Sequence, residues 1–175
     1  MYELRPPAPA LRPFIENYWF VRHAPGESVE LCVDVYVDAR ADLIFNFGAP
    51  YLREIIGEQA VEYSHSNLDA QRTVPIRITQ RGAIQTSGVR FRLGGLGPFA
   101  RSPLANWTGA TPRPADVLGE TAAALEGALA ACLQPTEQAD LLDAYFLAKM
   151  NVRSSKSAQT PDITIRRTLS KILSK

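Results

Sequence analysis

The chain has 175 residues and a formal net charge of +1, which is typical of one domain or of one domain with a small appendage. No apolar stretch approaches the ~20 residues of a membrane span, and the N-terminus lacks the basic and apolar segments of a signal peptide. The sequence therefore predicts a soluble cytoplasmic protein and argues against a membrane-embedded one.

The charges are unevenly distributed along the chain. Residues 1–150 carry thirteen Lys/Arg and seventeen Asp/Glu, a net charge of −4, whereas residues 151–175 carry six Lys/Arg and one acid, a net charge of +5. A mildly acidic body is not typical of a nucleic-acid-binding surface. We therefore expect residues 1–150 not to bind nucleic acid directly.

The first hundred residues carry short apolar runs bounded by turn residues. Four prolines in residues 1–13 favour an extended arm, and residues 66–74 are polar and irregular. Strands are predicted at residues 17–21, 30–37, 43–47, 52–56, 61–65, 75–80 and 84–93. Because no helical pattern separates these strands, they predict an antiparallel β-barrel or sandwich rather than a parallel α/β sheet.

The stretch 38–48 poses the main question about function. A polar turn leads into the apolar run Leu43–Phe47, and Gly48 ends it. Asn46 interrupts this run, and a buried amide without hydrogen-bond partners costs ~1–3 kcal/mol. Alternation places Leu43, Phe45 and Phe47 on one face of the strand and Ile44 and Asn46 on the other. If Asn46 faces the interior it is a pocket residue; if the phenylalanines do, the interior is packed shut.

The predicted strand 84–93 also has two distinct faces. Gln85 and Ser87 share a face with Val89 and Phe91, so we expect them to point inward, toward the wetter end of the barrel. Arg90 and Arg92 share the opposite face. We expect them to be solvated and paired with acids such as Asp34 or Glu30, with binding of an anionic effector as the alternative.

The C-terminal part changes to a helical period. Apolar residues recur at three and four positions from Leu118 to Leu133, before Pro135, and again after Thr136, which predicts an antiparallel helical hairpin. This hairpin either covers the open side of the barrel or contributes one helix to a dimer. Residues 152–161 read as a flexible linker, and a third helix is predicted from Asp162. Because the sequence stops within that helix, we expect a fragment cut inside a second domain.

Three stretches together resemble the N-terminal domain of a subgroup of AraC-family bacterial transcription regulators. They are Tyr18-Trp19-Phe20, Asp42–Gly48 with the preceding Asp38, and Gly88–Gly95. The last stretch has Leu93 where the family usually has proline. The resemblance covers roughly residues 1–150 and implies a cupin-like β-barrel sensor domain, followed in the family by a C-terminal domain with two helix-turn-helix motifs.

The resemblance implies a division of the chain and an α+β fold class. An antiparallel cupin-like β-barrel or sandwich takes residues 1–100, and a connection with the helical hairpin takes 101–150. Residues 151–161 are the linker, and 162–175 are the start of a truncated DNA-binding domain. The implied function is a non-catalytic regulatory domain that senses an effector, dimerises, or both, and does not bind DNA by itself.

Two other functions stay open at this point. The first alternative is a stand-alone small-molecule-binding or catalytic cupin-like barrel. The second is a purely structural domain that only dimerises. The partners expected for the favoured function are a small-molecule effector, a second copy of the chain, and DNA through the missing domain only, with no membrane.

The candidate site residues follow from polar or aromatic side chains on strands. The two histidines, His23 and His65, lie in separate segments without a His-x-His pair, so we expect no metal site. Because no nucleophile lies in a Gly-x-Ser-x-Gly-like turn, we also expect no catalytic residue, and we expect no cofactor. Polar groups on inward strand faces orient ligands in apolar cavities, although a structural hydrogen-bond network is the favoured alternative for Asn46, Tyr63, Gln85 and Ser87. Trp19 could stack on a ligand, but core packing is the favoured alternative for it. The ligand-binding candidates are Trp19, Asn46, Tyr63, Gln85, Ser87 and Arg90. The dimerisation candidates are Leu141, Leu142, Tyr145 and Phe146.

Overall fold

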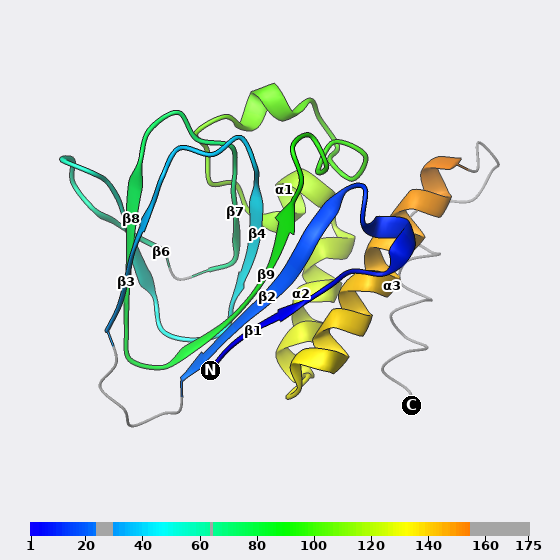
Figure 1. Ribbon diagram of the computed structural model, residues 1–175, viewed down its shortest axis with the longest axis horizontal. Helices are drawn as coiled ribbons and strands as arrows, with labels where there is room; N and C mark the ends of the chain where they lie inside the picture. Colours follow the sequence, from blue (N-terminus) through cyan, green and yellow to red (C-terminus); the bar gives the residue numbers. More distant parts are fainter. Residues whose placement is uncertain (24–29, 64, 155–175) are drawn as a thin grey trace.

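The computed structural model describes residues 1–23, 30–63 and 65–154, with the backbone alone for 152–154. Two antiparallel β-sheets face each other, and the C-terminal helices lie along the outer side of one of them (Figure 1). This arrangement confirms the predicted α+β class in its sandwich form. Most of the predicted linker and the whole predicted helix from Asp162 lie outside the described residues.

The larger sheet has five strands in the order β1-β2-β9-β4-β7. These strands are β1 (Tyr2–Arg5), β2 (Ile15–His23), β9 (Ile84–Phe91), β4 (Asp42–Asn46) and β7 (Asn67–Asp69). The central three were predicted from their apolar patterns. β1 and β7 were missed, because β1 lies in a proline-rich arm and β7 spans only three residues of a polar stretch.

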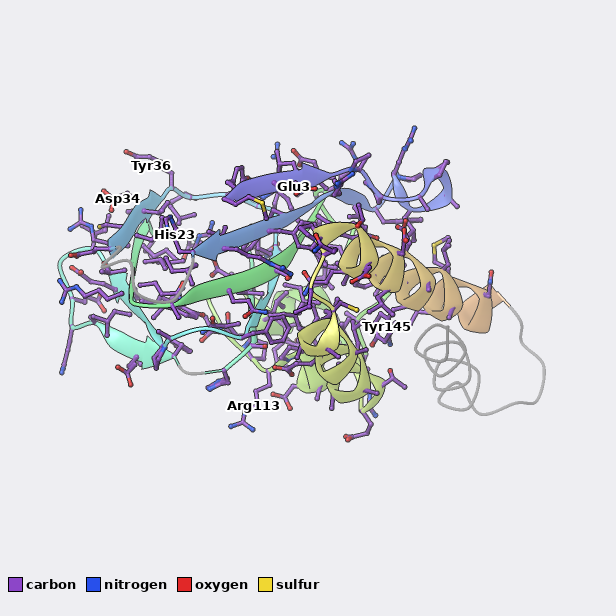
Figure 2. All side chains as sticks on the ribbon, turned by 90° about the horizontal axis from the view of Figure 1, so that it is seen from below. Glu3, His23, Asp34, Tyr36, Arg113 and Tyr145 are labelled. Atoms are coloured by element: carbon purple, nitrogen blue, oxygen red, sulfur yellow. The ribbon has the colours of Figure 1, made fainter. Side chains whose placement is uncertain are left out.

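The smaller sheet has four strands in the order β3-β8-β5-β6. They are β3 (Glu30–Val35), β8 (Ile76–Arg81), β5 (Tyr51–Ile55) and β6 (Val61–Tyr63). Asp34 and Tyr36 lie on the β3 side of the molecule, away from Tyr145 among the helices (Figure 2).

Three α-helices and two short 3-10 helices complete the described part of the chain. They are η1 (Pro9–Leu11), η2 (Leu104–Trp107), α1 (Pro114–Leu118), α2 (Thr121–Ala131) and α3 (Pro135–Ser154). The predicted hairpin corresponds to α2 and α3. Its first helix starts later than expected because Gly119, with a φ of 92°, ends α1 separately. α3 also continues into the region predicted as linker. Within the described residues, no helix combines the length and hydrophobicity needed to cross a membrane.

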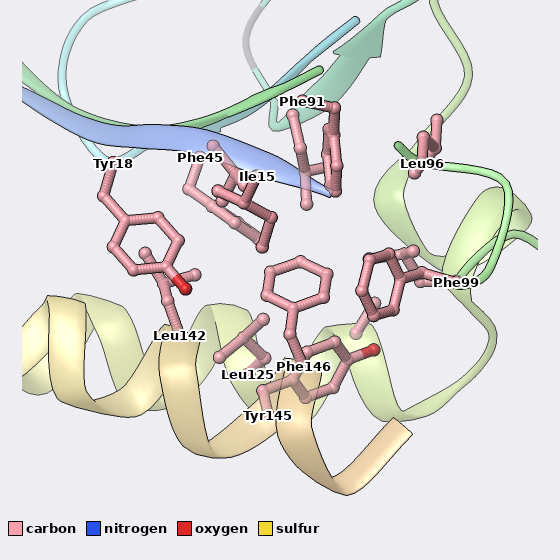
Figure 3. Close-up of a cluster of buried hydrophobic side chains, with 14 of the residues drawn as sticks. Ile15, Tyr18, Phe45, Phe91, Leu96, Phe99, Leu125, Leu142, Tyr145 and Phe146 are labelled. Carbon is pink, nitrogen blue, oxygen red and sulfur yellow. The ribbon is translucent and has the colours of Figure 1, made fainter. Parts of the chain in front are cut away.

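The hydrophobic core lies between the five-stranded sheet and the helices (Figure 3). Phe146 of α3 is at its centre, 5.7 Å from Phe91 of β9 and 4.9 Å from Phe99 between ring centroids. Both contacts are edge-to-face, an arrangement that aromatic pairs prefer. Phe45 of β4 reaches the same core from the sheet. The sheet therefore presents a continuous apolar face to the helices.

The four predicted dimerisation residues lie inside this core. Each of them is at most 1% exposed within the chain itself. They are Leu141, Leu142, Tyr145 and Phe146. Because their side chains already pack against the sheet and α2, they present no surface to a second copy. For these residues, the structure corresponds to the alternative in which the helical hairpin covers the sheet.

Hydrogen bonds also attach α3 to the sheet. Asp143 accepts hydrogen bonds from the Tyr18 hydroxyl at 2.7 Å and from the Ala8 backbone N–H at 2.9 Å. Burial, together with the bond to Asp143, raises the pKa of Tyr18. Gln138, also buried, accepts a hydrogen bond from Ser87 at 2.9 Å. The position of α3 is thereby linked to β2 and β9.

We expect Phe146→Ala to lower the free energy of unfolding by about 3–5 kcal/mol, because it leaves a cavity in a fully buried cluster. Urea denaturation followed by circular dichroism measures this change. The matched control Leu133→Ala removes a side chain that is 71% exposed and should change stability by less than ~0.5 kcal/mol. A loss below ~1 kcal/mol for Phe146→Ala, or one that depends on protein concentration, would contradict the intramolecular role.

Candidate ligand-binding cavity

The five-stranded sheet has a second face, which points toward the smaller sheet. Successive side chains alternate between the two faces of a strand. On each strand of this sheet, the residues that do not point toward the helices therefore point toward the smaller sheet. Cross-strand pairing arranges them in three rows. The first row is Asp69, Asp42, Arg90 and Asn17; the second is Asn67, Ile44, Gly88, Trp19 and Leu4; the third is Asn46, Thr86, Val21 and Tyr2.

The smaller sheet contributes a mostly apolar opposite wall. Its pairing aligns Leu31, Gln80 and Tyr51 in one row and Val33, Ile78 and Arg53 in the next. Of these six residues, Arg53 alone does not line the cavity. Leu31, Val33 and Val35 alternate along β3 and line the cavity. Cys32 has the opposite orientation and is exposed.

Between the two sheets lies a cavity of about 460 Å³, within the ~300–1,000 Å³ typical of small-molecule sites. Its wall is mainly aliphatic and aromatic, with a few polar and charged groups. The lining residues are Tyr2, Leu4, Glu16, Asn17, Trp19, Val21, Leu31, Val33, Val35, Asp42, Ile44, Tyr51, Asp69, Ile78, Gln80, Ile84, Thr86 and Arg90. Such a composition suits a ligand with a large apolar part and a small number of polar atoms.

Trp19 is held in place from two sides. Its indole lies over Gly88, where any Cβ atom would overlap the ring, and its Nε1–H donates a hydrogen bond to Asp42 Oδ1 at 3.1 Å. Gly88 and Trp19 are direct cross-strand partners. A glycine is therefore required on β9 for the indole to lie against the sheet and border the cavity.

Asp42 also binds Arg90 through both carboxylate oxygens. Arg90 Nε donates to Oδ1 at 3.1 Å and Nη2 donates to Oδ2 at 2.9 Å. This hydrogen bonding raises the pKa of Arg90. The predicted pairing of Arg90 with Asp34 or Glu30 is wrong, because those acids bind Arg77 and Arg81 on the smaller sheet.

Asp69 lies directly across from Asp42 on the adjacent strand. Arg72 Nη1 donates to its Oδ2, while Arg53 Nη2 stays 3.8 Å from its Oδ1. Burial raises the pKa of Asp69 from 3.8 to about 6, against the opposing effect of the two arginines. Sequence reasoning missed Asp69, since it lies in a stretch read as irregular loop.

Several buried polar atoms near Asp69 accept or donate no hydrogen bond among the described residues. They are Asp69 Oδ1, Asn67 Oδ1, Arg53 Nε and Arg72 Nε. Asn67 does donate through Nδ2 to the hydroxyl of Tyr51, whose pKa burial raises to about 12. Because buried polar groups are normally satisfied, this region has capacity for further partners.

Two of the six predicted ligand-binding residues, Trp19 and Arg90, line the cavity. Asn46 faces the same inner side, but its amide is hydrogen-bonded within the chain: its Nδ2 donates to Ala49 O at 3.0 Å and its Oδ1 accepts from Gln80 Nε2 at 3.3 Å. The question posed by strand 43–47 is thereby answered. Leu43 and Phe45 face the helices, so the space between the sheets is left open.

The other three predicted residues lie away from the cavity wall. Tyr63 stacks behind Tyr51, with ring centroids 5.6 Å apart, and its hydroxyl hydrogen-bonds Thr111. Gln85 and Ser87 were expected to point into the barrel, but Ser87 donates to Gln138 of α3 and Gln85 shares that face. The apolar face of β9 packs under the helices, and Thr86 faces the cavity instead.

The sequence pattern assigns Asp42 to a polar turn, whereas in the structure it is the first residue of β4 and lines the cavity. Because alternate residues of a strand share a face, its position two residues before Ile44 could have placed it on the same face as Ile44. In the described part of the chain, no group of three or more His, Cys, Asp or Glu side chains is placed to hold a metal ion.

Comparison with known families gives one match. Residues 3–112 match the family described as a domain of unknown function, DUF6597. The match begins within β1 and ends in the loop before α1, so it includes β2 to β9 in full and all the cavity-lining residues except Tyr2. No curated protein and no solved structure matches the chain.

We expect Gly88→Ala to displace the Trp19 indole and to destabilise the fold by about 1–3 kcal/mol, as overpacking does. Loss of the Trp19–Asp42 hydrogen bond should shift the indole N–H resonance in an NMR spectrum. The control Gly127→Ala lies on α2 with no atom near its added Cβ and should stabilise the helix by up to ~1 kcal/mol. An unchanged indole resonance in Gly88→Ala would contradict the packing described.

We expect Asp69 to titrate near pH 6 when its carboxyl carbon is followed by NMR, whereas Asp34, hydrogen-bonded by Arg77, should titrate below 3.8. The folded chain then keeps the Asp69 proton to a higher pH than the unfolded chain does. The free energy of unfolding should therefore fall because of Asp69 as pH rises from 3.8 to about 6, and stay level above that. A midpoint near 4 would refute this.

Proposed function

We propose that this chain, which belongs to the DUF6597 family, is the effector-sensing domain of an AraC-type transcription regulator. In this proposal the domain binds a small molecule in the cytoplasm and catalyses no reaction. It reaches DNA only through a separate helix-turn-helix domain. The observation that carries the proposal is the cavity of about 460 Å³ between the two sheets.

The cavity supports a binding role because it is separate from the packing that holds the fold. The helices cover one face of the five-stranded sheet with a closed hydrophobic core. The opposite face is lined by Ile44, Trp19 and their neighbours, with open space before the smaller sheet. A ligand can therefore occupy this space without displacing the helices.

The three stretches that carry the family resemblance also supply the cavity floor. Trp19 comes from the first stretch, Asp42 from the second, and Gly88 and Arg90 from the third. The indole of Trp19 lies over Gly88 and donates to Asp42, which in turn binds Arg90. The three stretches therefore meet in space at one wall of the cavity. These contacts support a shared binding role for them, in addition to the support from their order and spacing in the sequence.

The shared sheet offers a route from ligand to helices. On β4, Ile44 borders the cavity while Leu43 and Phe45 pack in the helix-facing core. On β9, Thr86 borders the cavity and Ser87 bonds Gln138 of α3. A ligand that favours one position of these strands would favour one position of α3. Such differential binding is the requirement for allosteric coupling.

Homodimerisation is part of the proposal on the strength of the resemblance alone. The buried residues Leu141, Leu142, Tyr145 and Phe146 take no part in it. A dimer contact would use residues that are exposed on the surface of the single chain.

A thermal-shift screen of metabolites tests the sensing role. A bound effector at a hundred times its Kd should stabilise the folded chain by ~2.7 kcal/mol. Ile44→Trp fills the cavity and should abolish the shift, whereas the control Leu133→Trp introduces the same side chain at an exposed site and should preserve it. Stabilisation that survives Ile44→Trp would place the binding site elsewhere.

A DNA-binding assay and product analysis test the rest of the proposal. We expect residues 1–175 to show no sequence-specific binding to promoter DNA, and we expect the stabilising compound to be recovered unchanged. Specific DNA binding would contradict the need for a separate domain. Turnover of the compound would favour the alternative of a catalytic barrel.

A further inference from the structure

The polar groups of the cavity are unevenly available to a ligand. At one end, Gln80 and Thr86 direct hydrogen bonds to Asn46 and Ala49. At the other end lies the charged row that contains Asp69, Asp42 and Arg90. The middle row offers Ile44 and Trp19, which are suited to apolar contact. The cavity therefore has two polar ends and an apolar middle, and the two ends differ in the groups that they can offer to a ligand.

The charges on the wall are already paired within the chain. Arg90 binds Asp42, and Arg72 binds Asp69. The carboxylate of Glu16 is paired as well, with its Oε2 2.9 Å from Arg40 Nη1. A charged ligand would lose its hydration here without meeting an unpaired counter-charge on the wall, which is costly in a buried site. This pairing favours an uncharged ligand.

At the charged end of the cavity, one acceptor oxygen lacks a hydrogen bond. Asp69 lines the cavity, its side chain is 6% exposed, and its Oδ1 accepts no hydrogen bond from any described residue. Arg53 and Arg72 also have buried Nε–H groups without acceptors. Neither arginine lines the cavity, however, so these donors do not face a ligand there.

The apolar middle favours a ring. Trp19 lies against the backbone at Gly88 on one side and borders the cavity. Its orientation is fixed by the hydrogen bond to Asp42, so the indole is already in position for a stacking partner. Offset stacking and edge contacts with aromatic rings are favourable beyond simple area burial.

We infer that the cavity takes an uncharged, ring-containing molecule that stacks on Trp19 and donates a hydrogen bond from a hydroxyl or N–H group to Asp69 Oδ1. This inference rests on the proposed function and specifies the ligand class for the same site. The donor pairs with Asp69 Oδ1, which accepts no hydrogen bond from the described residues, and the ring fills the apolar middle.

Four probes with the same ring system test the inference by calorimetric titration at pH 7.5. 2-Naphthol is uncharged and carries a donor, 2-methoxynaphthalene lacks the donor, 2-naphthoate is an anion, and 2-naphthylmethylammonium is a cation. We expect 2-naphthol to bind the wild-type chain at least tenfold more tightly than each of the other three. This comparison needs no variant and does not depend on how a substitution affects folding.

Variants then assign the preference to Asp69. Asp69→Asn should weaken 2-naphthol binding at least tenfold and leave 2-methoxynaphthalene within twofold. The control Asp34→Asn makes the same change in a carboxylate that does not line the cavity and that Arg77 already pairs, and it should preserve the preference. If Asp69→Asn fails to fold, the wild-type comparison decides alone.

The outcomes separate this inference from the proposed function. Equal binding of 2-naphthol and 2-methoxynaphthalene, or tighter binding of either ion, overturns the ligand class, while the cavity still binds a ligand that Ile44→Trp excludes. Absence of binding by all four probes overturns the inference. If the metabolite screen also yields no stabilising compound, the sensing function itself fails.

Discussion

The packing of α2 and α3 against one face of the five-stranded sheet is the constraint on which the rest of the structure depends. It places Phe45, Phe91 and Phe146 in one closed core and secures α3 through Asp143 and Gln138. Because this core stabilises the sheet from one side, the other side need not be filled by the smaller sheet. The cavity exists because the fold does not depend on closing it.

The side chains that form the floor of that cavity are held in place by contacts within the chain. Trp19 requires Gly88 beneath it and Asp42 beside it, and Asp42 is in turn held by Arg90. Side chains held by packing and hydrogen bonds lose little conformational freedom on binding, which favours affinity. Asp69 differs from this group, because burial raises its pKa and leaves one oxygen without a donor. The cavity thus combines a rigid apolar platform with an acceptor oxygen, Asp69 Oδ1, that receives no hydrogen bond from the described residues.

The match to the DUF6597 family covers β2 to β9 and most of β1, which together enclose the cavity, and it ends before α1. The helices that follow supply the closing layer of the core. A change at the cavity can reach them through adjacent residues of the same strand, as with Ile44 and Phe45. This two-sided sheet is the physical basis of the regulatory function that we propose.

The sequence by itself determined the α+β class, seven of the strands and the helical hairpin, because alternation and helical spacing are local properties. Two of the candidates predicted from the sequence, Trp19 and Arg90, line the cavity, although the pattern alone favoured core packing for Trp19 and a solvated position for Arg90. Only the tertiary structure decided which face of each strand meets the helices. Both faces of β9 are buried, so Ser87 and Thr86 are equivalent by pattern, yet one bonds α3 and the other borders the cavity. The role of Asp69 depends on β7 pairing with β4, a long-range contact that no local pattern specifies.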